Sequence, residues 1–303
     1  AFAPGREVVR FIEDYAVFVK APTRCGVEVT SLERAGGSSR YLLSTNNGAM
    51  EAANVVIATG PYQLAVIPSL SAHIPNDILQ VHCNAYRKPA QLPPGAVLVV
   101  GSGAAGCQIA EDLNQSGRQV CLSVGRHSRR PRKYRGKDFA YWGPVLGTTE
   151  QIVDTVPEQL RKGSEILLTG ANGGYDVDLR AMAARGIGLL GHLQGINGSE
   201  LILADDLTQN LGRGDESLEN FKRAVDDNVT KNGLDFPAEP EPAVEPYIPS
   251  PVSRLNLKDA GISSIVWASG FRCNFDWVRV PIFDEVGAPA HPRGVTQCPG
   301  FYF

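Results

Sequence analysis

The chain has 303 residues, of which 43% are hydrophobic and 20% charged, and its formal net charge is −3. This composition is typical of a globular protein that is long enough to bury a substantial core. The negative net charge argues against a nucleic-acid-binding protein, and no apolar run approaches the ~20 residues that a membrane span needs.

The first hundred residues predict one helix and several strands. Apolar residues recur at helical spacing over 6–19, and residues 26–34 alternate as a strand. A hairpin with Asn47-Gly48 at its turn follows, and it leads to a buried strand at 55–58. A polar connection with several prolines then continues to the next apolar run.

The rest of the chain alternates strands and helices, which predicts an α/β fold with a mainly parallel sheet. We expect a strand, a glycine turn and a helix over 97–115, and then a second strand over 119–125 and a basic run over 126–138. Further along we expect strands at 165–170, 186–196 and 262–270, helices at 178–186 and 216–233, and a proline-rich acidic linker at 236–251.

The six cysteines and five histidines show no metal or redox motif. No two cysteines form a C-x-x-C motif, and no two histidines share a helix face at the spacing of metal ligands. We therefore expect reduced thiols in a cytoplasmic protein and no metal site.

The stretch "VLVVGSGAAGCQIAEDL" contains the spacing G-x-G-x-x-G at Gly101, Gly103 and Gly106. A strand precedes these glycines and a helix follows them, the context in which the motif binds the pyrophosphate of a dinucleotide. The alternative is a glycine turn that serves packing alone. The predicted pyrophosphate-binding residues are Gly101, Ser102, Gly103, Ala104, Ala105 and Gly106.

The end of the second strand indicates which dinucleotide binds. An NAD or FAD site usually places an acid there, but residues 121–124 contain none. Ser123 and Arg126 suit the 2′-phosphate of NADPH instead, because a carboxylate would repel it. A solvated basic loop is the alternative, and it suits Lys133 and Arg135 better than Arg126. Nearby cations that could reinforce the site are Arg129 and Arg130.

Two similar strand ends bracket this region, "VVIATG" at 55–60 and "IVWASG" at 265–270. Small residues let a backbone cross close to a neighbour, so the pair predicts the points where a chain leaves one domain and returns. The alternative is two ordinary buried strands that stop at glycines. The residues expected near the crossing are Thr59, Gly60, Ser269 and Gly270.

Together, "NVVIATGPY", "GSGAAGCQIAEDL", "SVGR…RRPRKYRGKD" and "VWASGFR" resemble the class B flavoprotein monooxygenases. The resemblance implies a two-dinucleotide-binding-domain flavoprotein, in which a Rossmann-like, doubly wound NADPH domain is inserted into an FAD domain. On this basis we expect a partial FAD-binding domain with the crossing at 1–90, an NADPH-binding domain with a helical and proline-rich insertion at 91–270, and a return to the FAD-binding domain at 271–303.

The family fingerprint F-x-G-x-x-x-H-x-x-x-Y/W is half present. His82 and Tyr86 match its second half, whereas Asn76 and Ile78 replace the Phe and Gly of its first half. The tyrosine favours the flavin-containing monooxygenases over the Baeyer–Villiger enzymes. We interpret His82 as a hinge residue without a chemical step of its own.

The second glycine motif of the family, which binds FAD, is absent before Asn54. A segment that covers the flavin would follow the final "FYF" in the family pattern. We therefore expect a piece of a longer protein, with a whole NADPH domain and parts of an FAD domain.

The resemblance implies an FAD- and NADPH-dependent monooxygenase. NADPH would reduce FAD, and a C4a-(hydro)peroxyflavin would transfer one atom of O2 to a nitrogen, sulfur or carbonyl carbon of a small organic substrate. The flavin would supply the chemistry, so we assign no catalytic acid or base. A flavoprotein reductase without oxygenation and a non-catalytic NADPH-binding fragment are the alternatives. The absence of C-x-x-C argues against a thiol reductase, and the oligomeric state is left open.

Overall fold

The structure is a computed structural model that describes residues 2–36, 40–156, 166–238, 247–285 and 287–303. The chain divides into two compact units. We call them the larger unit, which comprises Phe2 and Ile67–Ser269, and the smaller unit, which comprises Ala3–Val66 and Gly270–Phe303.

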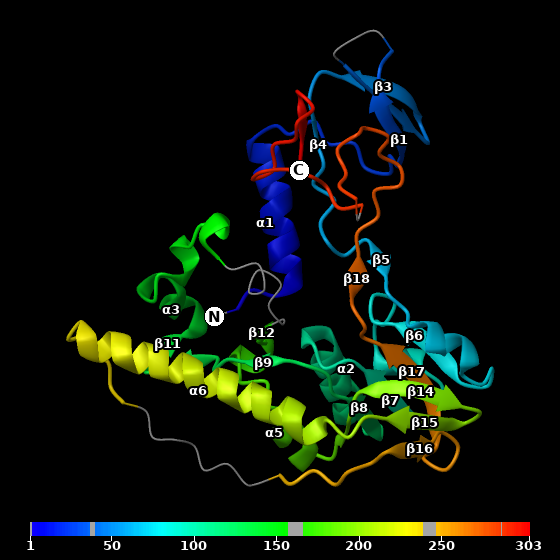
Figure 1. The fold of residues 1–303 in the computed structure, drawn as a ribbon, viewed down its shortest axis with the longest axis vertical. Helices are drawn as coiled ribbons and strands as arrows, with labels where there is room; N and C mark the ends of the chain where they lie inside the picture. The colour runs from blue at the N-terminus through cyan, green and yellow to red at the C-terminus, as the bar shows by residue number, and fades with distance from the viewer. Residues whose placement is uncertain (1, 37–39, 157–165, 239–246, 286) are drawn as a thin grey trace. The chain divides into compact units, whose positions relative to one another are not determined.

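The larger unit contains a five-stranded parallel sheet, to which the strands labelled β6, β7, β8 and β17 in Figure 1 belong. Its strand order is β13-β8-β7-β17-β6, and every neighbouring pair is parallel. All five residues of β7 are buried, as expected for a central strand that is covered on both faces. The strands are β6 (Leu79–His82), β7 (Ala96–Val100), β8 (Val120–Ser123), β13 (Gly188–Leu190) and β17 (Ile262–Trp267).

Alternate side chains of β7 point to opposite faces of the sheet and pack in two separate hydrophobic cores. Val97 and Val99 pack in a core with residues of α2 (Ala104–Gln115), α5 (Leu179–Ala184) and α6 (Leu207–Lys231). Leu98 and Val100 pack in a second core with residues of the antiparallel sheet β14-β15-β16. Helices therefore cover one face of the parallel sheet, and a second sheet covers the other.

The remaining elements of the larger unit are short and lie mostly between β8 and β17. Trp142 of α3 is fully buried in a small core with Phe221, Val225 and Val229 of α6. These elements are η1 (Ser69–His73), η2 (Pro89–Gln91), β9 (Ser128–Arg129), β10 (Lys133–Tyr134), β11 (Lys137–Asp138), α3 (Phe139–Val145), η3 (Thr148–Glu150), η4 (Val153–Thr155), β12 (Ile166–Leu167), η5 (Ala171–Gly173), β14 (Leu193–Asn197), β15 (Glu200–Leu203) and β16 (Arg254–Asn256).

The smaller unit contains a three-stranded antiparallel sheet, β1-β2-β3, and two strand pairs, β5 with β18 and β4 with β19. Leu32, Tyr41 and Phe301 are fully buried in its core. None of the fourteen residues of α1 is buried. The elements are α1 (Gly5–Phe18), β1 (Val29–Arg34), β2 (Tyr41–Thr45), β3 (Gly48–Ala52), β4 (Val55–Val56), β5 (Leu64–Ala65), β18 (Phe271–Arg272) and β19 (Phe301–Tyr302).

One detail of the strands differs from the prediction. The hairpin turn consists of Asn46 and Asn47, because Thr45 pairs with Gly48 and Gly48 already belongs to β3. The two similar strand ends lie in different sheets. β4 pairs with β19 in the smaller unit, whereas β17 is a strand of the parallel sheet in the larger unit.

The chain passes between the units after Val66 and after Ser269. The predicted first boundary at residue 90 lies too far along the chain, because β6 pairs with β17 and so belongs to the larger unit. The second boundary lies next to the predicted position.

Among the described helices, none has the length and apolar character that a bilayer crossing requires. All six cysteines are free. Within the described ranges, no three His, Cys, Asp or Glu side chains gather as a metal site would require.

Candidate functional site

The carboxyl ends of the parallel strands carry the predicted site. From β7 the chain passes through α2 to β8 on one side, while β17 lies on the other side of β7. The strand order therefore reverses between β7 and β17. In open parallel sheets, ligands bind at such a switch point, outside the carboxyl ends of the strands.

Gly101 and Gly106 let the backbone pack closely at this point. Gly101 has φ of +109°, and a Cβ there would overlap the carbonyl oxygen of Ala268, just after β17. A Cβ at Gly106 would overlap the carbonyl oxygen of Gly101 and approach the Ala268 Cβ to 3.2 Å. Packing alone therefore requires glycine at these two positions.

Gly103 has a different role, because its backbone does not require glycine. It is the N-cap of α2, with φ of −70° and ψ of 179°, and no side chain caps this helix end. An uncapped helix amino end with only small side chains around it leaves room for an anion. Gly103 and the first turn of α2 thus fit a dinucleotide pyrophosphate.

The loop after β8 is tied to the glycine turn by Ser102. The Ser102 hydroxyl accepts a hydrogen bond from the Gly125 N–H at 3.1 Å, and it lies 3.4 Å from the Gly125 carbonyl oxygen. Ser102 is only 3% exposed. This residue therefore shapes the site from within and does not offer its hydroxyl to a ligand.

The hydroxyl of Ser123 is also used internally. It donates to the Gly191 carbonyl oxygen at 3.0 Å and accepts from the Leu193 N–H at 3.1 Å. Ser123 is 2% exposed. The predicted contact with a phosphate is therefore corrected: the side chain joins β8 to the chain that follows β13.

Arg126 is exposed, and it enters no hydrogen bond or ion pair with the described residues. The arginines that follow it are engaged. Arg129 pairs with Asp178 and Asp215, and it cannot reinforce a phosphate site without breaking those pairs. The guanidinium of Arg130 donates to the carbonyl oxygens of Arg129 and Ser217.

The prediction of a solvated Arg135 is wrong. Its Nε lies 2.6 Å from a carboxylate oxygen of Asp226, and its side chain is only 14% exposed. Most of the basic run thus consists of structural cations. Arg126 and Lys133 are both exposed, and Arg126 directly follows Gly125, which is bonded to the glycine turn.

His82 and Tyr86 secure the segment after β6. His82 is 5% exposed, and its Nδ1 lies 3.1 Å from Asn84 Oδ1 and 3.3 Å from the Asn84 backbone nitrogen. The Tyr86 hydroxyl donates to Asp112 of α2 at 2.6 Å. Burial and this hydrogen bond raise the pKa of Tyr86, so it remains a neutral donor. Both residues are placed to hold this segment, in line with a positioning role.

The four residues predicted near the crossing lie on either side of the unit boundaries. In the smaller unit, Gln63 Nε2 donates to Thr59 Oγ1 at 2.8 Å and to the Gly60 carbonyl oxygen at 2.9 Å. The Gly270 carbonyl oxygen accepts from the Val66 N–H at 3.1 Å, where β5 pairs with β18. Ser269 is the last residue of the larger unit. These contacts shape the crossing segments.

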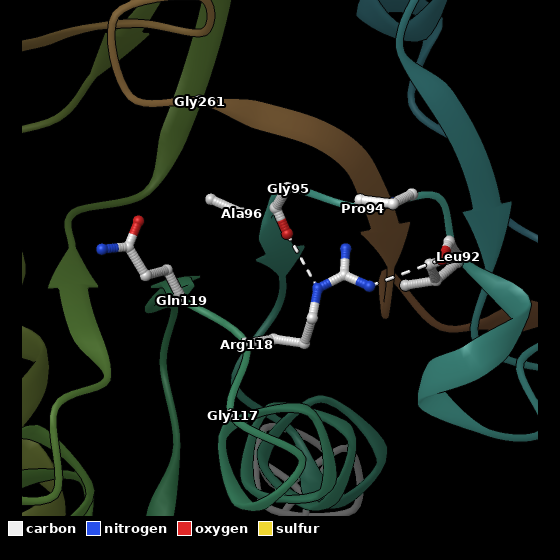
Figure 2. Close-up of a pocket in the computed structure, with 8 residues that line it drawn as sticks. All are labelled: Leu92, Pro94, Gly95, Ala96, Gly117, Arg118, Gln119 and Gly261. Carbon is white, nitrogen blue, oxygen red and sulfur yellow. Dashed lines mark hydrogen bonds between the residues drawn. The ribbon is translucent and has the colours of Figure 1, made fainter.

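The opposite, amino edge of the parallel sheet holds a cavity of about 580 Å³ (Figure 2). Its charged lining residue is Arg118, whose guanidinium donates to the carbonyl oxygens of Gly95 at 2.8 Å, Pro93 at 2.6 Å and Leu92 at 3.4 Å. Figure 2 shows the guanidinium between Gly95 and Leu92. Three of its five N–H donors bind backbone carbonyl oxygens, so this cavity is a poorer candidate for anion binding than the carboxyl edge.

Two residues beside the carboxyl edge were not predicted from the sequence. His127 is 4% exposed, and Gly214 of α6 packs against its ring. The available signal was the pair of glycines, Gly212 and Gly214, inside an otherwise amphipathic helix, where glycine is unfavourable.

A parallel α/β unit with a glycine turn at its switch point, inserted between two stretches of a second unit, defines the class of two-dinucleotide-binding-domain flavoproteins. The chain belongs to the pyridine nucleotide-disulphide oxidoreductase family, whose model matches residues 2–163. It is therefore an oxidoreductase.

Among curated proteins, the chain is 28% identical over 300 residues to an uncharacterized CzcO-like oxidoreductase of Geobacillus kaustophilus, covering 98% of this chain and 69% of that protein. It is 24% identical to the uncharacterized oxidoreductase CzcO of Bacillus subtilis, covering 100% and 71%. Over 114 residues it is 32% identical to the flavin-containing monooxygenase iboF of Amanita muscaria, covering 34% and 20%.

Solved structures share the fold at low sequence identity. A flavin monooxygenase from Stenotrophomonas maltophilia has a TM-score of 0.59 at 14% identity, covering 98% of this chain and 67% of that one. The cadaverine monooxygenase DfoA of Erwinia amylovora, solved bound to FAD, has a TM-score of 0.56 at 13% identity, covering 97% and 65%.

Proposed function

We propose that the chain binds NADPH at the carboxyl edge of the parallel sheet and works with FAD in a monooxygenase. The reaction would insert one oxygen atom of O2 into a nitrogen, a sulfur or a carbonyl carbon of a small organic substrate. The observation that carries the proposal is Arg126, an exposed guanidinium that has no partner among the described residues and lies in the loop tied to the glycine turn.

Different residues of the site bind different parts of the coenzyme. Gly103 and the first turn of α2 bind the pyrophosphate through backbone N–H groups and the positive helix end. Arg126 binds the 2′-phosphate, since a guanidinium makes paired, charge-assisted hydrogen bonds to phosphate oxygens. Ser123 has no part in this scheme.

FAD, when bound, would supply the redox and oxygen chemistry, as cofactors do in such enzymes. The likeness to flavin monooxygenases in fold, and to iboF over 114 residues, supports the oxygenase assignment. The chain's own residues hold and orient the coenzyme. None of them is assigned a proton-transfer role.

Calorimetric titration of the chain with NADPH and NADH tests the coenzyme assignment. We expect NADPH to bind at least ~10-fold more tightly, since hydrogen bonds to charged groups contribute about 1.5–3 kcal/mol. Arg126→Met should remove this preference and leave the affinity for NADH unchanged. Equal affinities in the unchanged chain, or a preference that survives Arg126→Met, would overturn the assignment.

An NADPH-dependent flavoprotein reductase is the second candidate, because the family is named for disulphide oxidoreductases and the longest matches are named only as oxidoreductases. With FAD and NADPH, a thioether, a tertiary amine and a cyclic ketone serve as probes under isotopically labelled O2. Label in a product supports oxygenation. NADPH oxidation with no labelled product supports the reductase, and coenzyme binding with no NADPH oxidation supports a non-catalytic chain.

A further inference from the structure

The peptide group of Gly125 is held from both sides. Its N–H donates to Ser102 in the glycine turn, and its carbonyl oxygen lies 3.2 Å from Nδ1 of His127. The next residue is Arg126. Two buried side chains therefore fix the backbone from which the presented guanidinium projects.

His127 is unusual among the polar residues of this region. It is 4% exposed, and its Nε2 has no hydrogen-bond partner within the described part of the chain. A carbonyl oxygen can only accept, so the proton of the neutral ring resides on Nδ1 and the orphaned Nε2 carries the lone pair. A buried, unsatisfied polar atom is costly, and such atoms in native structures point to a constraint.

The constraint is the contact between the ring and α6. A Cβ at Gly214 would lie 2.5 Å from Nε2 and 3.0 Å from Cδ2 of His127, and 3.3 Å from Cδ of Arg129. Gly214 is buried within a helix, where glycine costs about 1 kcal/mol relative to alanine. Two unfavourable features therefore coincide where α6 packs against the loop: a glycine inside a helix, and a buried ring nitrogen without a hydrogen bond.

The residues next to this contact hold α6 and the loop together. The Arg129 N–H donates to the Ser217 hydroxyl at 2.8 Å, and the Arg129 guanidinium pairs with Asp215 and Asp178. Figure 1 shows α6 running past β9. Every polar group of residues 127–129 described above is directed inward, whereas Arg126 points to solvent.

We propose that His127, seated in the notch at Gly214 of α6, is a positioning residue that sets Arg126 for the 2′-phosphate and so determines the preference for NADPH over NADH. The inference rests on the proposed coenzyme assignment.

The test compares two glycines of one helix. Gly214→Ala places a methyl group against the ring, whereas Gly212→Ala adds one at an exposed position with nothing within 4 Å. We expect Gly214→Ala to weaken NADPH binding about 10-fold, the loss expected from one broken buried hydrogen bond, with little change for NADH. Gly212→Ala should leave both affinities unchanged. An unchanged NADPH/NADH ratio in a folded Gly214→Ala variant would overturn the inference.

His127 variants keep the test decisive if Gly214→Ala does not fold. His127→Phe retains a ring but removes the donor to Gly125, and should lower the NADPH/NADH affinity ratio. His127→Asn restores a donor near the position of Nδ1 and should recover much of the ratio. If His127→Phe and His127→Asn behave alike, or if both match the unchanged chain, His127 has no positioning role.

A double-mutant combination separates this inference from the coenzyme assignment. In an Arg126→Met background, His127→Phe should have no further effect on the ratio, because the positioned group is gone. A ratio that is insensitive to Arg126→Met alone refutes the coenzyme assignment. A ratio that falls with Arg126→Met but not with His127→Phe refutes only the role of His127.

Discussion

The two edges of the parallel sheet use polar side chains in opposite ways. At the amino edge, the Arg118 guanidinium donates to three backbone carbonyl oxygens beside a cavity. At the carboxyl edge, buried Ser102 and His127 fix the backbone, and Arg126 is exposed with no partner in the part of the chain that the structure describes. On the proposed assignment, the comparison teaches that available donors, and not cavity volume, mark the edge at which the coenzyme binds.

Gly106→Ala should break the carboxyl edge most severely. The new Cβ would overlap the Gly101 carbonyl oxygen, which is backbone and cannot rotate away. We expect a loss of about 3 kcal/mol of stability, measured by urea unfolding, and a loss of NADPH affinity of about 100-fold or more, measured by calorimetry. Gly212→Ala controls for adding a methyl group to a helix. Wild-type NADPH affinity in Gly106→Ala would show that the turn does not contact the coenzyme.

Arg118→Met should lower the stability of the chain at the amino edge without changing coenzyme binding. Loss of the hydrogen bonds to Gly95, Pro93 and Leu92 should cost about 2 kcal/mol in urea unfolding. NADPH affinity should stay unchanged. Gln119→Ala changes an exposed side chain of the same cavity and serves as the control. A large loss of NADPH affinity in a folded Arg118→Met variant would reverse the assignment of the two edges.

The stability of the chain should fall as the pH drops below about 6.5, the usual pKa of histidine. Burial lowers the pKa of His127 and Arg129 lowers it further, against the opposing effects of the Gly125 carbonyl, Asp215 and Asp178. The unfolded chain therefore binds the proton first, so acid favours unfolding, by at most about 1.4 kcal/mol per pH unit.

Urea unfolding at pH 7.5 and pH 5.5 measures this effect. The difference in unfolding free energy between the two pH values should be smaller in His127→Asn than in the unchanged chain, since the other titrating groups are common to both. An identical pH dependence in the two proteins would mean that His127 titrates as a solvated histidine.

Ser102→Ala should have the smallest effect on stability and a selective effect on binding. The Gly125 N–H loses its acceptor, which should cost about 1 kcal/mol. NADPH affinity should fall several-fold, because the loop that carries Arg126 is released. Ser116→Ala removes a similar hydroxyl, which donates to Leu113 at the far end of α2. Equal NADPH affinities in the two variants would mean that Ser102 acts on stability alone.

Much of the fold follows from local patterns. The apolar run at β7, the glycine spacing and the amphipathic run at α2 predict a strand, a turn and a helix, because each depends on residues close in sequence. The absence of an acid at the end of β8 is likewise readable from the sequence. The boundary after Val66 is not, since β6 joins the sheet by pairing with β17, far along the chain.

The sequence by itself determined the carboxyl-edge glycine turn and the cations available beside it. Only the tertiary structure decided which of those groups are presented. The Ser123 hydroxyl donates to the carbonyl oxygen of Gly191, 68 residues away, and the Arg129 guanidinium pairs with Asp215, 86 residues away. Such partners are brought together by folding, so a side chain's availability to a ligand is a property of the packed chain and not of its local pattern.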